Sequence, residues 1–394
     1  MKIVDVSAFY SEQGGGVRTY VHQKLAAAAR LGHVAVIIAP GRESREDIHP
    51  GGKIVWVKAP VLPVDKRYHM FLSSTEVMRI LNREQPDVVE GSTPWYAGWI
   101  AGHWQGSAVK SLVMHADPVA VYAHTLLGAR LGIARVDRLF GWFWRYLRRL
   151  NAPFDCTVVA GEWLARRFTG FGLRNVVTVP FGIDRAHFHG GMRDPTLRAR
   201  MLAACGLPET AKLLLTIGRH HPEKRLPVMI SAVGKVNQAR PDGVGLYLVG
   251  DGLSRARIDR AAAQVPHVHV AGQVPDRALV ARMMASADAV IHGSGCETFG
   301  LSVAEALCCG APIIVPDTGG AFDFAGPEYS EVYPLGDADG AAKAIGRLLA
   351  RDWNQLAKAA NAAAASRIGT ADTHFDRLFA LYESLVRQRS QPRT

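Results

Sequence analysis

Two glutamates stand eight positions apart in the stretch GCETFGLSVAEALCCG, residues 295 to 310. Glu297 precedes a predicted helix that begins near Leu301, and Glu305 falls one turn inside that helix among apolar neighbours. A helix that is apolar almost all round is normally buried, and a buried carboxylate needs a partner. No cation lies within one helical turn of Glu305. We therefore expect either a remote arginine or lysine, or a bound ligand, to satisfy this carboxylate.

Cations and glycine turns follow the other predicted strands in the same half of the chain. Arg219 and Lys224 come after KLLLTIG, and glycine turns come after the strands GLYLV and APIIVPD. Arginine grips a diphosphate with a fork of N–H groups, whereas lysine supplies a point charge. Such turns gathered at one sheet edge indicate a nucleotide-phosphate site. The alternative for Arg219 and Lys224 is a solvated surface pair.

The backbone between the two glutamates fits the same kind of site. Residues 298–301 would present N–H groups at a helix N-terminus, and Gly300 would let that backbone approach a phosphate closely. One turn further on, Glu305 would accept both hydrogens of a ribose 2′,3′-diol. A neutral ligand group with two donors would thus satisfy the carboxylate without a cation from the protein.

These residues need a scaffold, and the chain alternates predicted strands with predicted helices twice. Residues 1–188 and residues 189–372 each indicate a doubly wound parallel sheet of the α/β class. Open sheets of this class bind ligands outside the carboxyl ends of their strands. We expect the last helix, with the polar tail in residues 373–394, to pack back towards the first domain.

The composition excludes several classes of protein. No stretch of the 394 residues is long and apolar enough to cross a bilayer, and the start MKIVDVSAFY predicts a strand rather than a signal peptide. Five cysteines without metal-ligand spacing favour reduced thiols in a cytoplasm. Residues 1–190 hold 23 Lys+Arg and 15 Asp+Glu, most of the net charge of +11. This excess suits an anionic partner, but no zinc-finger or RNA-binding motif supports nucleic acid.

The spacing E-x7-E in GCETFGLSVAEA, with GR-x4-K in TIGRHHPEK, resembles the retaining glycosyltransferases of family 4. GDG at 250–252, VPFGID at 179–184 and GGGV at 14–17 fit the same family across nearly the whole chain. The resemblance implies the GT-B fold, in which two Rossmann-like domains face each other across a cleft. It also implies transfer of a hexosyl unit from a nucleotide-diphosphate sugar without a metal or another cofactor.

The resemblance assigns roles by position. Glu305 would hold the ribose, and Arg219 with Lys224 would hold the diphosphate. Glu297 would face the hydroxyls of the transferred sugar, and catalysis would rest on stabilising charge on the leaving group. His115, at a predicted strand end, would lie near the donor sugar unless it is a core histidine. The other residues placed around the donor are Gly15, Gly16, Gly218, Gly252, Val274, Thr298, Phe299, Gly300 and Leu301.

The acceptor contacts stay open at this stage. The glycine loop at residues 14–16 would either approach the phosphates from the first domain or position the acceptor. Many relatives carry a histidine after the strand that here reads DVVEGSTPW. This chain has Glu90, Gly91 and Ser92 there instead, which puts the acceptor contacts in doubt.

Several functions remain in competition. A UDP-sugar is the favoured donor, because the opening FYSEQGGGVRTY resembles that of bacterial glycolipid-synthesising members. GDP-mannose, used by a mannosyltransferase in polysaccharide assembly, is the alternative. A nucleotide-sugar epimerase explains the two spacings less well, and a non-catalytic scaffold would show eroded phosphate residues.

The stretch VDRLFGWFWRYLRRLN, residues 136–151, predicts an amphipathic helix. Apolar side chains share one face, arginines the opposite face, and two tryptophans the borders, as in helices that lie in a membrane interface. The alternative is a stripe that packs on the core of the first domain. We expect a lipid or lipid-linked acceptor and a cytoplasmic enzyme bound peripherally to the inner face of an anionic membrane. The membrane-facing candidates are Trp142, Trp144, Arg145, Arg148 and Arg149.

Overall fold

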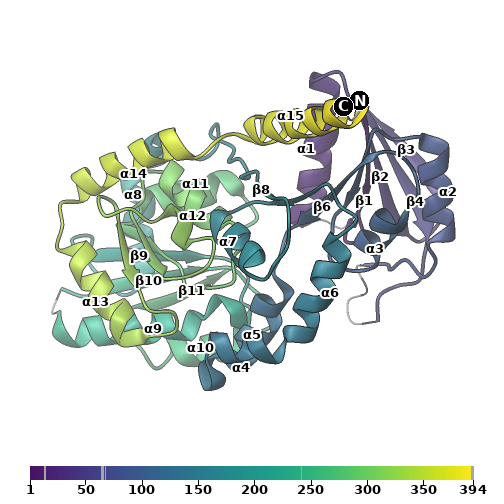
Figure 1. The fold of residues 1–394 in the computed structure, drawn as a ribbon. Coiled ribbons are helices and arrows are strands. Elements are labelled where there is room, and N and C mark those ends of the chain that lie inside the picture. Colours follow the sequence, from purple (N-terminus) through teal and green to yellow (C-terminus); the bar gives the residue numbers. More distant parts are fainter. Residues whose placement is uncertain (13–14, 64–65, 67, 241, 392–394) are drawn as a thin grey trace.

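Two β-sheets, one in each half of the chain, form the framework of this computed structural model (Figure 1). The structure describes residues 1–12, 15–63, 66, 68–240 and 242–391. In spatial order, the first sheet contains β3 (Arg45–His49), β4 (Gly52–Lys58), β2 (Val34–Gly41), β1 (Lys2–Val6), β5 (Val88–Gly91), β6 (Val109–Met114), β7 (Cys156–Val159) and β8 (Val176–Thr178). The second sheet contains β11 (Val268–Gly272), β10 (Val244–Val249), β9 (Lys212–Ile217), β12 (Ala289–Ile291), β13 (Ile313–Pro316) and β14 (Ser330–Tyr333).

Each pair of neighbouring strands is parallel except β3 and β4 at one edge.

The helices of the first half are α1 (Gly16–Arg30), α2 (Thr75–Glu84), α3 (Tyr96–His103), η1 (Val119–His124), α4 (Thr125–Leu131), α5 (Ile133–Leu139), α6 (Gly141–Asn151) and α7 (Glu162–Gly170). Those that follow are η2 (Gly190–Met192), α8 (Pro195–Ala204), η3 (Pro222–Lys224), α9 (Leu226–Ala239), α10 (Arg255–Ala262), α11 (Arg277–Ser286), α12 (Leu301–Cys308), η4 (Phe322–Phe324), α13 (Ala338–Leu349), α14 (Trp353–Arg367) and α15 (Ala371–Ser390). This architecture confirms the predicted fold of two doubly wound α/β domains.

Each sheet separates two hydrophobic cores, because successive side chains of a strand point to opposite faces. In β1, Val4 belongs to one core and Ile3 to the other. In β9, Leu213 and Leu215 belong to one core and Leu214 to the other. Strands buried on both faces read as nearly continuous apolar runs, which is why KLLLTI and VAVIIAP carry so few polar residues.

The chain passes between the two halves twice, and the two crossings touch. The Ile183 N–H, shortly after β8, donates to the Gly369 carbonyl just before α15, at 2.9 Å. Gly182 is needed there, because a Cβ at this position would lie 1.9 Å from the Thr370 backbone. Beyond this contact, α15 lies along α1 and β6 of the first sheet (Figure 1). The domain bounds at residues 188 and 372 stay a prediction.

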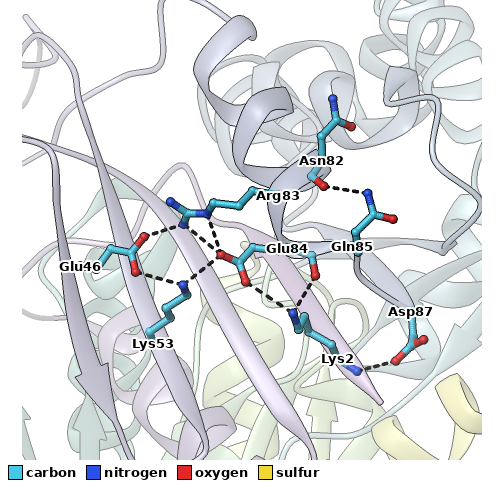
Figure 2. A network of polar contacts seen from close by, with 8 residues as sticks. All are labelled: Lys2, Glu46, Lys53, Asn82, Arg83, Glu84, Gln85 and Asp87. Carbon is cyan, nitrogen blue, oxygen red and sulfur yellow. Dashed lines mark hydrogen bonds and ion pairs between the residues drawn. The ribbon is translucent and has the colours of Figure 1, made fainter.

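A network of ion pairs fixes the amino ends of the first sheet (Figure 2). Lys53 Nζ lies 2.9 Å from Glu84 at the end of α2 and 2.9 Å from Glu46 on β3. Arg83 reaches Glu46 at 2.5 Å, and Lys2 Nζ lies 3.6 Å from Glu84. Ligands bind at the opposite edge of such a sheet, so we assign this network to stability rather than to function.

A second network lies inside the first domain and is fully buried. Lys24 of α1 donates to Asp5 of β1 at 2.8 Å and to Glu90 of β5. The Tyr382 hydroxyl of α15 donates to the other Glu90 oxygen at 2.6 Å and lies 3.0 Å from Ser111 Oγ. Glu90 thus joins the closing helix to the central strands, which accounts for the departure from histidine after β5. Glu90 is thus a fully buried carboxylate with partners on two helices.

Tyr382→Phe should lower the free energy of unfolding by about 1–3 kcal/mol, because it removes one hydrogen bond from a buried carboxylate. Chemical denaturation measures the effect. Arg387→Ala, on the exposed side of the same helix, is the matched control and should change stability by less than about 0.5 kcal/mol. A Tyr382→Phe protein as stable as the wild type would contradict the structural role of this network.

Candidate active site

The predicted donor residues of the second domain follow the strands of its sheet, which reverses its strand order at β9. β9 is the first strand of this domain in sequence, with β10 on one side and β12 on the other. The crevice beside such a switch point, outside the carboxyl ends of the strands, is the usual ligand site of an open α/β sheet. Lys224 follows β9 and Glu297 follows β12, so the fold brings residues 73 positions apart to the same place.

Lys224 and Glu297 form an ion pair with each other. The lysine Nζ donates directly to the glutamate Oε1, and both side chains are largely buried. Burial works to lower the pKa of Lys224, but the nearby Glu297 carboxylate outweighs it and raises that pKa. Arg219 remains exposed, with its guanidinium 3.9 Å from Glu223. The site therefore holds one lysine that is already paired and one arginine that is free to turn towards a ligand.

Glu305 has a protein partner that its sequence neighbourhood does not reveal. Arg277, at the start of α11, donates to Glu305 Oε1 at 2.7 Å and lies over the Phe188 ring at 4.9 Å. This is the remote arginine that the sequence left open as an alternative to a ligand. Burial raises the pKa of Glu305, and Arg277 offsets only part of that effect. Because the arginine side chain is mostly exposed, the ion pair is weak enough for a ligand to replace it.

The start of α12 presents its backbone to the crevice. Gly300 has a φ of 92°, and a Cβ there would lie 3.0 Å from the Ala321 backbone, so only glycine fits. Leu301 begins the helix and is exposed. Phe299 instead points into the core, in edge contact with Phe181 and Phe324. Phe299 can therefore contribute its amide to an anion but not its ring.

The glycine turns of the donor domain stand in direct contact. A Cβ on Gly250 would lie only 1.9 Å from the Gly218 carbonyl oxygen, and one on Gly252 would lie 2.9 Å from the His220 carbonyl oxygen. Val274, on the loop after β11, packs against the hydrophobic core. The predicted donor residues at Gly218, Gly252 and Val274 thus offer backbone groups at the sheet edge.

His115 links the donor edge to the first domain. It follows β6, and its carbonyl accepts a hydrogen bond of 3.0 Å from the Thr298 hydroxyl of the donor loop. Its ring stacks on Phe181 and meets Tyr20 edge-on. Burial lowers the pKa of His115 to about 4, so the imidazole is neutral at neutral pH.

A cavity of about 160 Å³ opens in the first domain beside His115. Its polar lining includes Asp5, Ser92 and Thr93, and its apolar lining includes Trp95 and Tyr122. Gly15 caps α1, which begins at Gly16 and sends Val17 and Tyr20 to the same cavity. Residue 14 of the predicted glycine loop lies outside the described residues. Gly15 and Gly16 therefore lie at the start of the helix that lines this cavity, and their role towards donor or acceptor stays a prediction.

Sequence reasoning missed two residues of the donor site. Arg277 lies 28 positions before Glu305, and no spacing rule connects the two. His292 directly follows β12, a strand-end position that could have singled it out. Its Nε2 lies 3.7 Å from Glu297 and has no hydrogen-bond partner among the described residues. Burial lowers the pKa of His292 to about 4, so a neutral donor or acceptor stands beside the Lys224–Glu297 pair.

The predicted interfacial helix is two helices, and its apolar stripe faces inward except at Leu139. The run breaks at Phe140, where α5 ends and α6 is about to begin. Trp144 is only 2% exposed and stacks on Phe171 at 3.9 Å, so its prediction as membrane-facing is wrong. Arg148 donates to the Phe171 carbonyl at 3.0 Å. Trp142, 58% exposed, still faces outward, as do Arg145 and Arg149.

Within the described ranges, no group of three or more His, Cys, Asp or Glu side chains is placed to hold a metal ion. Among the helices of the described residues, none combines the length and the apolar character that a membrane span requires.

Comparison with known proteins agrees with this geometry. Residues 14–187 match the family described as Glycosyltransferase Family 4, and residues 198–367 match the family described as Glycosyl transferases group 1. The fold and the donor edge thus define a glycosyltransferase of the GT-B fold. More specifically, the chain belongs to glycosyltransferase family 4.

Two relatives come from Mycobacterium tuberculosis. The chain is 29% identical over 319 residues to a GDP-mannose-dependent alpha-(1-6)-phosphatidylinositol dimannoside mannosyltransferase, covering 81% of this chain and 80% of the relative. It is 28% identical over 344 residues to a GDP-mannose-dependent alpha-mannosyltransferase, covering 86% and 85%. The names of these relatives give no support to the expected UDP-sugar.

Solved structures share the fold over nearly the whole chain. Sucrose-phosphate synthase from Thermosynechococcus elongatus superposes with a TM-score of 0.74 at 19% identity, covering 98% of this chain and 99% of that one. Anabaena HepE in complex with UDP superposes with a TM-score of 0.72 at 16% identity, covering 97% and 99%. At these identities the similarity establishes the two-domain architecture and not the donor.

Proposed function

We propose that this protein is a retaining mannosyltransferase that moves mannose from GDP-mannose to a lipid-linked acceptor at the inner face of a membrane. The observation that carries this proposal is the meeting of the cationic donor edge with the first-domain cavity. The Thr298–His115 hydrogen bond joins the two. The names of both relatives favour GDP-mannose over a UDP-sugar. The phosphatidylinositol dimannoside in one of those names favours a lipid acceptor over a soluble one.

Leaving-group stabilisation is the main chemical task of the donor edge. Lys224 and Arg219 would bind the diphosphate, and the amides at the start of α12 would face the same charge. As the bond from the mannose C1 to the departing phosphate oxygen breaks, the acceptor oxygen bonds to C1 on the same face. The acceptor proton passes to the departing phosphate, so GDP and an α-mannoside leave. The protein supplies cations where other enzymes use a divalent ion.

Ligand binding would exchange partners at both glutamates. The ribose diol would replace Arg277 at Glu305, and the diphosphate would replace Glu297 at Lys224. Glu297 would then turn to the mannose hydroxyls, with the neutral His292 beside it. Each of the two ion pairs thus supplies a partner for a carboxylate that would otherwise be isolated and buried at a high cost in free energy.

The first-domain cavity suits the polyol headgroup of an acceptor. Asp5 and Ser92 present oxygens at its wall, with the Ser92 hydroxyl donating to Asp5 at 2.5 Å. Trp95 and Tyr122 offer aromatic faces, against which sugar-like rings pack. The buried free cysteines of the described chain fit a reducing compartment, as a site on the cytoplasmic face requires.

The donor assignment is tested by incubating the protein with GDP-, UDP- and ADP-sugars and a total lipid extract. Mass spectrometry should detect a lipid heavier by one hexose only with GDP-mannose, and GDP release should require the lipid. EDTA should leave the rate unchanged.

Three other results would each contradict a different part of the proposal. Transfer from a UDP-sugar alone contradicts the donor assignment, and nucleotide release without acceptor contradicts transfer. Activity that EDTA abolishes and magnesium restores contradicts the cation-only mechanism.

Glu305→Ala should weaken GDP binding by at least about tenfold, because two hydrogen bonds from the ribose lose their charged acceptor. Calorimetry on the folded variant measures this. Arg277→Ala is the matched control: it removes the same ion pair but leaves the carboxylate, so GDP should bind at least as tightly as to the wild type. Equal affinities of the wild type and the Glu305→Ala protein would contradict the ribose role.

A further inference from the structure

Apart from Trp142 on α6, the exposed apolar side chains of residues 122–151 gather on the hairpin formed by α4 and α5. Leu126 is 73% exposed, Tyr122 just before it 64%, and Leu139 at the end of the hairpin 61%. Leu127, Leu131 and Ile133 are also exposed. Single exposed apolar residues are ordinary, but a run of them on one hairpin indicates an interaction surface.

The charges around this surface are of one sign. From residue 118 to residue 150 the sequence contains six arginines and a single acidic residue, Asp137. Arg130, Arg135 and Arg138 of the hairpin are exposed, and none pairs with a carboxylate within the part of the chain that the structure describes. Apolar side chains next to unpaired arginines complement the acyl boundary and the headgroups of an anionic bilayer.

The acidic residue is turned inward and holds the hairpin to the domain. Asp137 accepts hydrogen bonds of 2.9 Å and 2.6 Å from Arg167 and one of 2.8 Å from His124. Although burial opposes it, the hydrogen bonds from Arg167 and His124 lower the pKa of Asp137 to about 2. Arg167 also pairs with Asp117, which caps the first residues of η1. The outward face is therefore held in place and is not an unfolded segment.

The hairpin adjoins the acceptor cavity. Tyr122 lines that cavity and also begins the exposed apolar run. Trp142 and Trp95 each contact the Phe143 ring, at a centroid distance of 5.9 Å, so aromatic contacts connect the residue that follows the hairpin with the cavity wall. Indole rings prefer the headgroup level of a bilayer. In Figure 1, α4 and α5 lie together at the lower margin of the molecule.

We infer that the α4–α5 hairpin enters an anionic phospholipid surface and holds the acceptor cavity at the level of the lipid headgroups. This inference rests on the proposed lipid-linked acceptor and names the element that meets the membrane. A headgroup then reaches Tyr122 and His115 without its acyl chains leaving the bilayer. The exposed apolar residues insert, and the arginines bind lipid phosphates.

The test is co-sedimentation with vesicles of phosphatidylcholine alone and of equal parts phosphatidylcholine and phosphatidylglycerol. The wild type should bind the anionic vesicles at low salt, and salt should weaken the binding. One variant carries Leu126→Asn, Leu131→Asn and Leu139→Asn, and a second carries Arg130→Glu, Arg135→Glu and Arg138→Glu. Each should lower the partition coefficient by at least about tenfold.

The matched control carries the same change of charge away from the hairpin, as Arg200→Glu, Lys358→Glu and Arg377→Glu on α8, α14 and α15 in the upper part of Figure 1. It should retain clearly more vesicle binding than the hairpin charge variant. Thermal unfolding of each variant establishes that it is folded. Wild-type protein that ignores anionic vesicles overturns the inference, and so do folded hairpin variants that bind as well as the control.

Transfer in detergent separates this inference from the proposed function. With donor and lipid acceptor dispersed in detergent micelles, both hairpin variants should keep wild-type turnover, because the donor edge and the cavity lining are unchanged. Hairpin variants that lose turnover in detergent as well contradict a role in membrane docking alone. Wild-type protein that binds vesicles through the hairpin but transfers nothing in detergent contradicts the proposed function and leaves the docking surface standing.

Discussion

Buried charge must be paired, and the donor site meets this constraint by pairing its own residues. Lys224 binds Glu297 and Arg277 binds Glu305, at the switch point of the second sheet. Both carboxylates belong to the E-x7-E spacing, and both cations come from other strands or helices. A nucleotide sugar carries what is needed to replace them, namely a diphosphate for the lysine and a diol for the second glutamate. The fold of the second domain brings these cations and carboxylates, which are far apart in the sequence, into contact.

In the first domain, the buried charges are also paired, but their partners are fixed side chains of the protein. Lys24, Asp5, Glu90 and Tyr382 form a buried network in which each charged group has a partner from the protein itself. It ties the closing helix to the strands that carry the acceptor cavity, since Asp5 belongs to both. The donor-side ion pairs can be replaced by ligand groups, whereas the pairs beside the first-domain cavity are fixed. This suits a reaction in which the donor loses its diphosphate while the first domain holds the acceptor in place.

The fold and part of the donor site could be predicted from the sequence, for physical reasons. Parallel strands buried on both faces leave apolar runs, and strand ends mark the ligand edge, so the fold and the placement of Lys224 and Glu297 followed. The partner of Glu305 did not, because Arg277 is brought near only by the packing of α11 on α12. The sequence predicted the apolar stripe of α6 but not what the stripe packs against. An amphipathic pattern indicates that one face of a helix is apolar, and it does not indicate whether the protein core or a membrane covers that face. Trp144 therefore turned out to be core, while the outward surface belongs to the neighbouring hairpin.

The claim that a donor diphosphate competes with Glu297 for Lys224 is tested most directly by the affinity of a Glu297→Gln protein for GDP. Removing the carboxylate frees the lysine and takes a negative charge away from the diphosphate. The account predicts GDP binding tighter by about tenfold, roughly 1.4 kcal/mol, in isothermal calorimetry. Glu328→Gln, an exposed glutamate of the same domain, is the control and should bind GDP as the wild type does. A folded Glu297→Gln protein whose affinity for GDP is unchanged or weaker would contradict the exchange of partners.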